Sequence, residues 1–153
     1  MNVRVWIAAA FAGLGLLALS RRAARYLHPV PGARLTSPFG WRIHPVTGRR
    51  SFHNGVDFAV PIGTPILAPD TGTVTAVYNE AAGGLSMVVT FADLSRAGFA
   101  HLHSTALGVG DIVHRGETIA LSGASGNATG PCLHFTLNDG TQYVDPLLYL
   151  PNA

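Results

Sequence analysis

The sequence predicts a mainly β protein with one antiparallel β-sheet or sandwich domain over residues 35–153 and an apolar helix before it. Glycine and proline become dense from about Arg34 onward, which is typical of turns between short strands. Short runs rich in β-branched and aromatic residues lie between these turns. After residue 30, no stretch shows the 3.6-residue apolar repeat of an amphipathic helix.

Residues 1–25 form the first element, a membrane anchor or signal-like segment. The 16 residues from Val5 to Ser20 carry no charge, and arginines flank them on both sides. A spanning helix needs about 20 apolar residues, so the segment is short for that role. Two interpretations stay open: an uncleaved anchor through residues 5–20, which we favour, and a signal peptide cleaved after a small-x-small site at Ala18-Leu19-Ser20. More arginines follow the segment than precede it, and the positive-inside rule would then keep the following domain inside.

Residues 26–34 follow as an extended, proline-containing linker. The domain after it contains eight runs that predict strands. These are Asp57–Val60, Pro65–Ala68, Thr73–Tyr78, Ser86–Phe91, Gly98–His101, Thr118–Ser122, Leu133–Leu137 and Gln142–Val144.

The distribution of charge excludes several classes of function. Residues 1–50 hold eight arginines and no acid, whereas residues 51–153 hold two arginines and eight acids, so the two parts carry +8 and −6. A basic leader suits a membrane surface, while the acidic remainder argues against a nucleic-acid partner. The chain has no lysine, which excludes a lysine nucleophile or a lysine-linked prosthetic group. Its one cysteine, Cys132, rules out an intrachain disulfide.

Histidines and one carboxylate mark the candidate chemistry. His53 and Asp57 stand four residues apart in FHNGVDF, where Gly55 favours a turn into a strand. His134 falls in a predicted strand of GPCLHF, and Cys132, two residues earlier, shares its strand face. His101 lies in a third β-run, GFAHLH. Two histidines and one carboxylate would make three zinc ligands with a fourth position open, and one histidine would remain to handle protons.

Several separated runs resemble one family. SPFGWRIHPVTGRRSFHNGVDFAVPIGTPILAPDTGTV, FAHLH and VGDIVHRGETIALSGASGNATGPCLHF are similar in content, order and spacing to the lysostaphin/LytM-type zinc metallopeptidases, over roughly residues 35–147. The resemblance implies the LytM (duplicated hybrid motif) type of antiparallel β domain. It also implies a groove for the cross-linking peptides of bacterial peptidoglycan.

Carried over residue by residue, the resemblance makes His53, Asp57 and His134 the ligands of Zn²⁺ and His101 a catalytic histidine. His44, in RIHPVTG, fits the family's entry motif as a substrate-binding loop residue. One position departs from the pattern: the family has His-x-His where this chain has Cys132-Leu133-His134. Cys132 therefore stands at a catalytic position, and an active but weakened endopeptidase is expected. A thiolate of Cys132 closing the zinc site is the rival outcome.

The remaining histidines have simpler interpretations: His103 as a rim or spectator residue, and His28 and His114 as surface residues. Ser122 and Ser125 have no evident base and acid, so a serine hydrolase is disfavoured.

Two functions from other classes compete with the endopeptidase. A degenerate domain of the same fold could bind peptidoglycan or regulate a partner hydrolase, and Cys132 is the support for it. A lipoyl or biotinyl carrier is excluded because the chain has no lysine to modify. The expected location is a membrane-anchored one that faces the periplasm or cell wall, in a Gram-negative envelope or as a phage lysin in a virion membrane.

Overall fold

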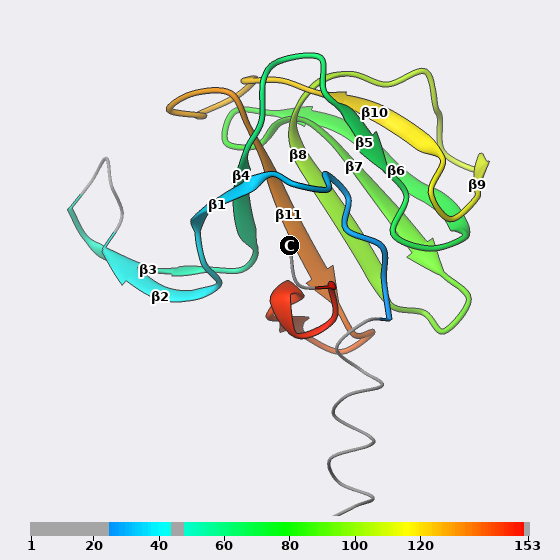
Figure 1. The fold of residues 1–153 in the computed structure, drawn as a ribbon, viewed down its shortest axis with the longest axis horizontal. Coiled ribbons are helices and arrows are strands. Elements are labelled where there is room, and N and C mark those ends of the chain that lie inside the picture. Colours follow the sequence, from blue (N-terminus) through cyan, green and yellow to red (C-terminus); the bar gives the residue numbers. More distant parts are fainter. Residues whose placement is uncertain (1–24, 44–47, 152–153) are drawn as a thin grey trace, which may run out of the picture.

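A computed structural model describes residues 25–43 and 48–151 (Figure 1). Twelve strands and one turn of 3₁₀ helix make up the described part, and all strand pairs are antiparallel. The elements are β1 (Arg34–Ser37), β2 (Gly40–Ile43), β3 (Arg50–His53), β4 (Val56–Ala59), β5 (Pro65–Leu67), β6 (Gly72–Glu80), β7 (Gly84–Phe91), β8 (Arg96–Ser104), β9 (Ile112–Val113), β10 (Thr118–Ser122), β11 (Cys132–Asn138), β12 (Tyr143–Val144) and η1 (Pro146–Leu148).

The main sheet has ten strands, with the order β1-β4-β11-β8-β7-β6-β9 along its principal path. Strand β10 pairs with both β5 and β8, while β12 pairs with β11. Strands β2 and β3 form a separate two-stranded hairpin, which projects to one side of the main sheet in Figure 1. The prediction of a mainly β, antiparallel domain is therefore confirmed.

The eight predicted strands all correspond to strands of the structure, but β1, β2, β3 and β9 were missed. Two residues are too few for a pattern in β9, and the four-residue runs of β2 and β3 mix charged or polar residues with apolar ones. Such runs form strands because a partner completes their hydrogen bonds, as in the pairing of Trp41 with Phe52. The structure also adds one short 3₁₀ turn, capped by the Asp145 carboxylate, which accepts a hydrogen bond from the backbone N–H of Leu147.

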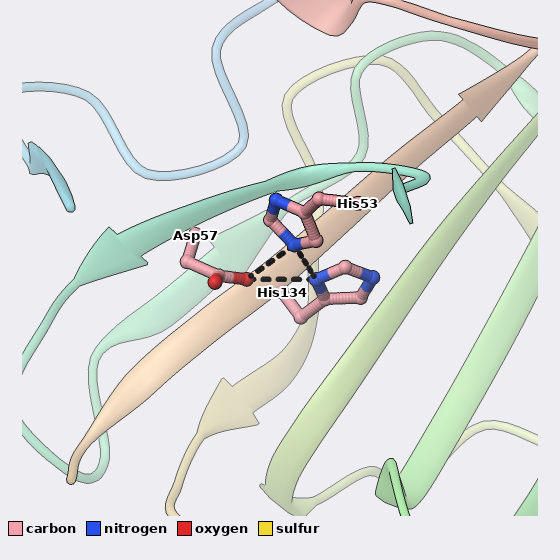
Figure 2. Close-up of side chains that lie close together, drawn as sticks. All are labelled: His53, Asp57 and His134. Carbon is pink, nitrogen blue, oxygen red and sulfur yellow. Dashed lines mark hydrogen bonds and ion pairs between the residues drawn. The ribbon is translucent and has the colours of Figure 1, made fainter. Parts of the chain in front are cut away.

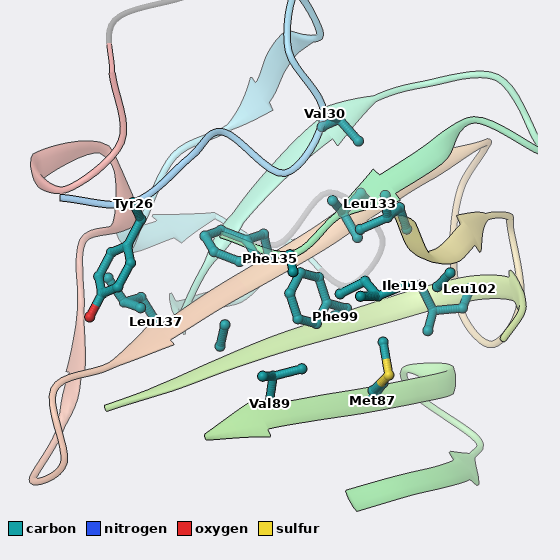
Figure 3. Packing of buried hydrophobic residues seen from close by; sticks show 14 of the residues in the cluster. Tyr26, Val30, Met87, Val89, Phe99, Leu102, Ile119, Leu133, Phe135 and Leu137 are labelled. Carbon is teal, nitrogen blue, oxygen red and sulfur yellow. The ribbon is translucent and has the colours of Figure 1, made fainter. Parts of the chain in front are cut away.

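Alternation along β11 separates the core from the site. Leu133, Phe135 and Leu137 are at most 1% exposed and pack into the hydrophobic cluster drawn in Figure 3. The residues between them, including His134, point to the other face, because successive side chains of a strand alternate. Burial of each large apolar side chain contributes about 1.5–3 kcal/mol, so the core holds the register of this strand firmly.

Residues 26–34, predicted as a linker, are part of the domain instead. Tyr26 and Val30 are each 2% exposed and belong to the core cluster. The Tyr26 ring stacks on Phe91 with 5.2 Å between ring centroids. The backbone N–H of Tyr26 donates a hydrogen bond to the carbonyl of Tyr149. The stretch contains bends and a turn at Pro31 and Gly32, closed by a hydrogen bond from the Ala33 N–H to the Val30 carbonyl, rather than the extended chain predicted. Its two apolar side chains are buried in the core. The folded unit therefore includes residues 25–34 as well as the predicted domain from residue 35.

The predicted apolar helix lies outside the described residues, apart from Arg25 at its end. No helix within residues 25–43 and 48–151 has the length and apolar character needed to cross a bilayer.

Replacing Tyr26 tests this boundary. Tyr26→Ala should lower the free energy of unfolding by about 3–5 kcal/mol, as expected when a buried aromatic side chain is removed. Leu148→Ala, at a side chain that is 62% exposed, should change it by no more than about 0.5 kcal/mol. Denaturant unfolding of the full chain measures both. Equal stability of Tyr26→Ala and wild type would indicate that residues 26–34 are a linker after all.

Candidate metal centre

Three side chains from three strands converge on the polar face of the sheet. His53 ends β3, Asp57 lies on β4 and His134 lies on β11 directly opposite Asp57 in the strand pairing. Gly55 makes the short connection between His53 and Asp57 possible. A Cβ at this glycine would lie only 2.4 Å from the carbonyl oxygen of Phe135. The sequence spacing of four residues thus becomes a tight turn that brings both side chains against β11.

The donor atoms of this trio lie within hydrogen-bonding distance of one another (Figure 2). Asp57 Oδ1 is 2.7 Å from His134 Nδ1 and 3.3 Å from His53 Nε2, and the two imidazole nitrogens are 3.1 Å apart. His53 is buried, whereas the side chains of His134 and Asp57 are 19% and 22% exposed. The trio therefore presents one open side to solvent.

A backbone carbonyl sets the tautomer of His53. Its Nδ1 lies 2.8 Å from the carbonyl oxygen of Pro38, which can only accept a hydrogen bond. Nδ1 must therefore carry the proton and donate, so Nε2 directs its lone pair at the other two residues. A histidine oriented in this way through its second nitrogen is typical of metal ligands in proteins.

The charge of Asp57 is also stabilised. Burial acts to raise the pKa of its carboxyl, but the close contacts with the His134 and His53 imidazoles outweigh this and hold that pKa well below its usual range. The carboxylate is therefore ionised at neutral pH. Arg42 adds a cation at the rim, with a guanidinium nitrogen 3.9 Å from Asp57 Oδ2.

This donor set fits a zinc ion. Two imidazole nitrogens and one carboxylate oxygen, all within 4.8 Å of one another, are the only such group in the part of the chain that the structure describes. Tetrahedral zinc with bonds of about 2.0–2.2 Å separates its ligands by roughly 3.4 Å, slightly more than the distances between these atoms. A small outward movement of the side chains would accommodate the ion, and three protein ligands would leave a fourth position open.

His101 lies beside the trio. Its ring packs edge-on against His134, with 6.2 Å between ring centroids, and its Nδ1 is 2.8 Å from the carbonyl oxygen of Ser125. His101 adjoins Ala100, which is paired with His134, so neighbouring strands β8 and β11 bring the two imidazoles together.

Cys132 is half-buried on the same face of β11 as His134 and carries a free thiol. Its sulfur does not belong to the group of converging donor atoms described above. Burial and the nearby Asp57 carboxylate raise the pKa of the Cys132 thiol to about 11. In the metal-free protein the group is therefore a neutral thiol, not a thiolate, at physiological pH.

The other histidines separate as follows. His103 and His114 are exposed, so His114 is a surface residue as predicted, whereas the rim or spectator role of His103 stays a prediction. His28, predicted as a surface residue, is 7% exposed because residues 26–34 pack on the domain, and burial lowers its pKa. His44 lies outside the described residues, so its predicted role stays a prediction.

Sequence reasoning missed Pro38, Arg42 and Ser125, which contact or approach the site. Two of them act through backbone carbonyls, and no sequence pattern marks a functional carbonyl. Arg42 could have been noticed as an arginine between two apolar residues, Trp41 and Ile43, on the strand that pairs with the one ending at His53.

The antiparallel β domain and its open His-Asp-His site place this chain in the class of metal-dependent peptidase domains. Residues 51–146 match Peptidase family M23, and the chain belongs to that family.

Known relatives share most of the described chain. The peptidoglycan DD-endopeptidase ShyB of Vibrio cholerae is 39% identical over 132 residues, which are 84% of this chain and 30% of that protein. A zinc-containing peptidase structure from Vibrio cholerae superposes with a TM-score of 0.74 at 38% identity, covering 83% of this chain and 40% of the other. The catalytic domain of lysostaphin from Staphylococcus simulans gives 0.69 at 28% identity, covering 77% and 92%. The chain thus spans less than a third of ShyB.

Proposed function

We propose that this chain is a zinc-dependent endopeptidase that hydrolyses peptide cross-links of bacterial peptidoglycan. The observation that carries the proposal is the convergence of His53, Asp57 and His134 on one partly exposed point, with His101 beside them. The names of similar proteins, a peptidoglycan DD-endopeptidase and a zinc-containing peptidase, support the substrate and the metal.

A zinc ion at this site would lower the pKa of a bound water to about 7 and polarise the scissile carbonyl. The chain's own residues supply charge, ring orientation and proton transfer. Asp57 supplies negative charge, and the Pro38 carbonyl holds the His53 ring in place. His101 donates through Nδ1 to the Ser125 carbonyl, so its Nε2 is free to exchange a proton with the substrate side of the site.

Cys132 limits this machinery. Its thiol shares the face of His134, but a neutral thiol is a weak hydrogen-bond donor, and with a pKa of about 11 it is a poor base at neutral pH. His101 is then left as the proton-transfer group of the described site. The same substitution favours a second candidate function, a domain that binds peptidoglycan or regulates a partner hydrolase without cutting.

We also propose that residues 5–20 anchor the chain in a membrane, with the domain facing the periplasm or cell wall. An uncharged run of 16 residues supports the anchor. The location of the proposed substrate supports the orientation, although the arginines that follow the run favour the opposite one by the positive-inside rule.

Zinc content tests the metal assignment. The full chain should hold close to one zinc per molecule after desalting, and His53→Ala, Asp57→Ala or His134→Ala should each abolish tight binding, because two ligands do not offset desolvation of the ion. His103→Ala, at an exposed histidine of the same strand as His101, is the matched control and should keep its zinc. Elemental analysis provides the measurement. Zinc-free wild type, or zinc-loaded ligand variants, would refute the assignment.

Digestion of purified peptidoglycan, followed by mass spectrometry, tests the activity. Wild type should release cross-linked peptides slowly, and Cys132→His should be faster by about 10- to 100-fold, because a second imidazole restores general acid-base help. Cys132→Ala should keep its zinc. Loss of metal in Cys132→Ala would point to a thiolate ligand, and inertness of all three proteins would favour the binding function.

Deleting residues 2–24 tests the anchor. The cut leaves Arg25, whose guanidinium pairs with the Asp93 carboxylate. The full chain should sediment with membranes, whereas the truncated one should stay in the supernatant with the same zinc content, because the deletion removes none of the three donor residues. A truncated protein that still sediments with membranes would contradict the anchor.

A further inference from the structure

The backbone of His101 is strained. Its φ is 61°, in the left-handed region, and Leu94 is the one other non-glycine residue with positive φ within the described ranges. The strain coincides with an irregularity in the pairing of β7 and β8, where Leu85 faces Leu102 but Met87 faces Phe99. An extra residue is thus accommodated at this point of β8, which turns the His101 side chain toward the site. Strain of this kind persists only where surrounding contacts impose it.

Two backbone carbonyls from different loops hold His101 in this strained conformation. The His101 backbone N–H donates to the carbonyl of Gly83 at 2.7 Å. Its ring Nδ1 donates to the carbonyl of Ser125 at 2.8 Å. Separate hydrogen bonds therefore hold the main chain and the ring of His101. The bond from Nδ1 leaves the lone pair of the ring on Nε2.

Ser125 is itself fixed by its hydroxyl group. The hydroxyl donates to the carbonyl of Leu102 at 2.8 Å and accepts from the backbone N–H of Leu85 at 3.1 Å. One side chain thus ties the loop before β11 to both β7 and β8, at the residue pair that borders the irregularity. Its own backbone carbonyl then faces the His101 ring.

Two glycines allow these loops to meet. A Cβ at Gly84 would lie 2.3 Å from the Ser125 hydroxyl oxygen, and a Cβ at Gly126 would lie 2.3 Å from the Gly84 nitrogen. Both glycines also have positive φ, at 63° and 69°. Backbone therefore packs on backbone, at a distance that no larger residue permits.

We propose that Ser125 is a positioning residue that, with Gly84 and Gly126, clamps His101 in a strained backbone conformation and in the tautomer that peptide hydrolysis needs. The inference rests on the proposed endopeptidase function. The orientation of His101 is important in this chain because Cys132 occupies the place of a second catalytic imidazole. The orientation of one ring then determines most of the proton transfer that side chains can provide.

A double-mutant cycle on the full chain tests the clamp, with a soluble cross-linked muropeptide as substrate. Ser125→Ala should lower kcat by about 10- to 100-fold, the range typical of lost orienting partners, with KM and zinc content unchanged. In a His101→Ala background the same change should have no further effect, because Ser125 acts through that ring. Ser95→Ala, at a buried serine hydrogen-bonded to Tyr26, is the control and should keep wild-type kcat.

A measurement on wild type covers the case in which Ser125→Ala does not fold. Imidazole ¹⁵N shifts of the metal-free full chain should show His101 with its proton on Nδ1 and slow exchange of that proton. The opposite tautomer would overturn the clamp, as would an equal loss of kcat from Ser125→Ala with and without His101. A His101→Ala variant with wild-type kcat would overturn the catalytic role of His101 and the clamp together. An inactive His101→Ala alongside a fully active Ser125→Ala would overturn the clamp alone.

Discussion

The pairing of β11 with β4 is the constraint on which the site depends. It sets His134 opposite Asp57, while the alternate residues Leu133 and Phe135 are completely buried. A shift of this register by one residue would expose those two apolar side chains and bury His134 without its partner. The hydrophobic core therefore fixes the spacing of the metal donors. Because the donors come from strands and not from flexible loops, they are held in place before any ion binds.

Two backbone carbonyls orient imidazole rings at the site. Pro38 orients His53, and Ser125 orients His101, each by accepting a hydrogen bond from Nδ1. In both cases the same result follows: the proton is held on one nitrogen and the lone pair of the other is free. In the proposed function one imidazole would serve as a ligand and the other as a proton carrier, a difference that arises from where each carbonyl places the ring.

Much of the fold and of the trio could be predicted from local pattern. Runs rich in β-branched, aromatic and other apolar residues identified strands such as β6, β7 and β11, and the residue types at positions 53, 57 and 134 indicated zinc. The hairpin β2–β3 and the packing of Tyr26 could not be predicted. Both depend on partners far away in the sequence, since Tyr26 meets Phe91 and Tyr149 only after the sheet has formed.

The sequence by itself determined the class of the chemistry, because ligand types, the absence of lysine and the Cys132 substitution are properties of residues alone. Tertiary structure decided which atoms meet. It selected Nε2 of His53 and Nδ1 of His134, left Cys132 as a neutral thiol and bent β8 at His101. The physical reason is that burial, tautomer and backbone strain arise from contacts between distant segments. Composition and spacing along the chain contain no information on those contacts until the strands pair.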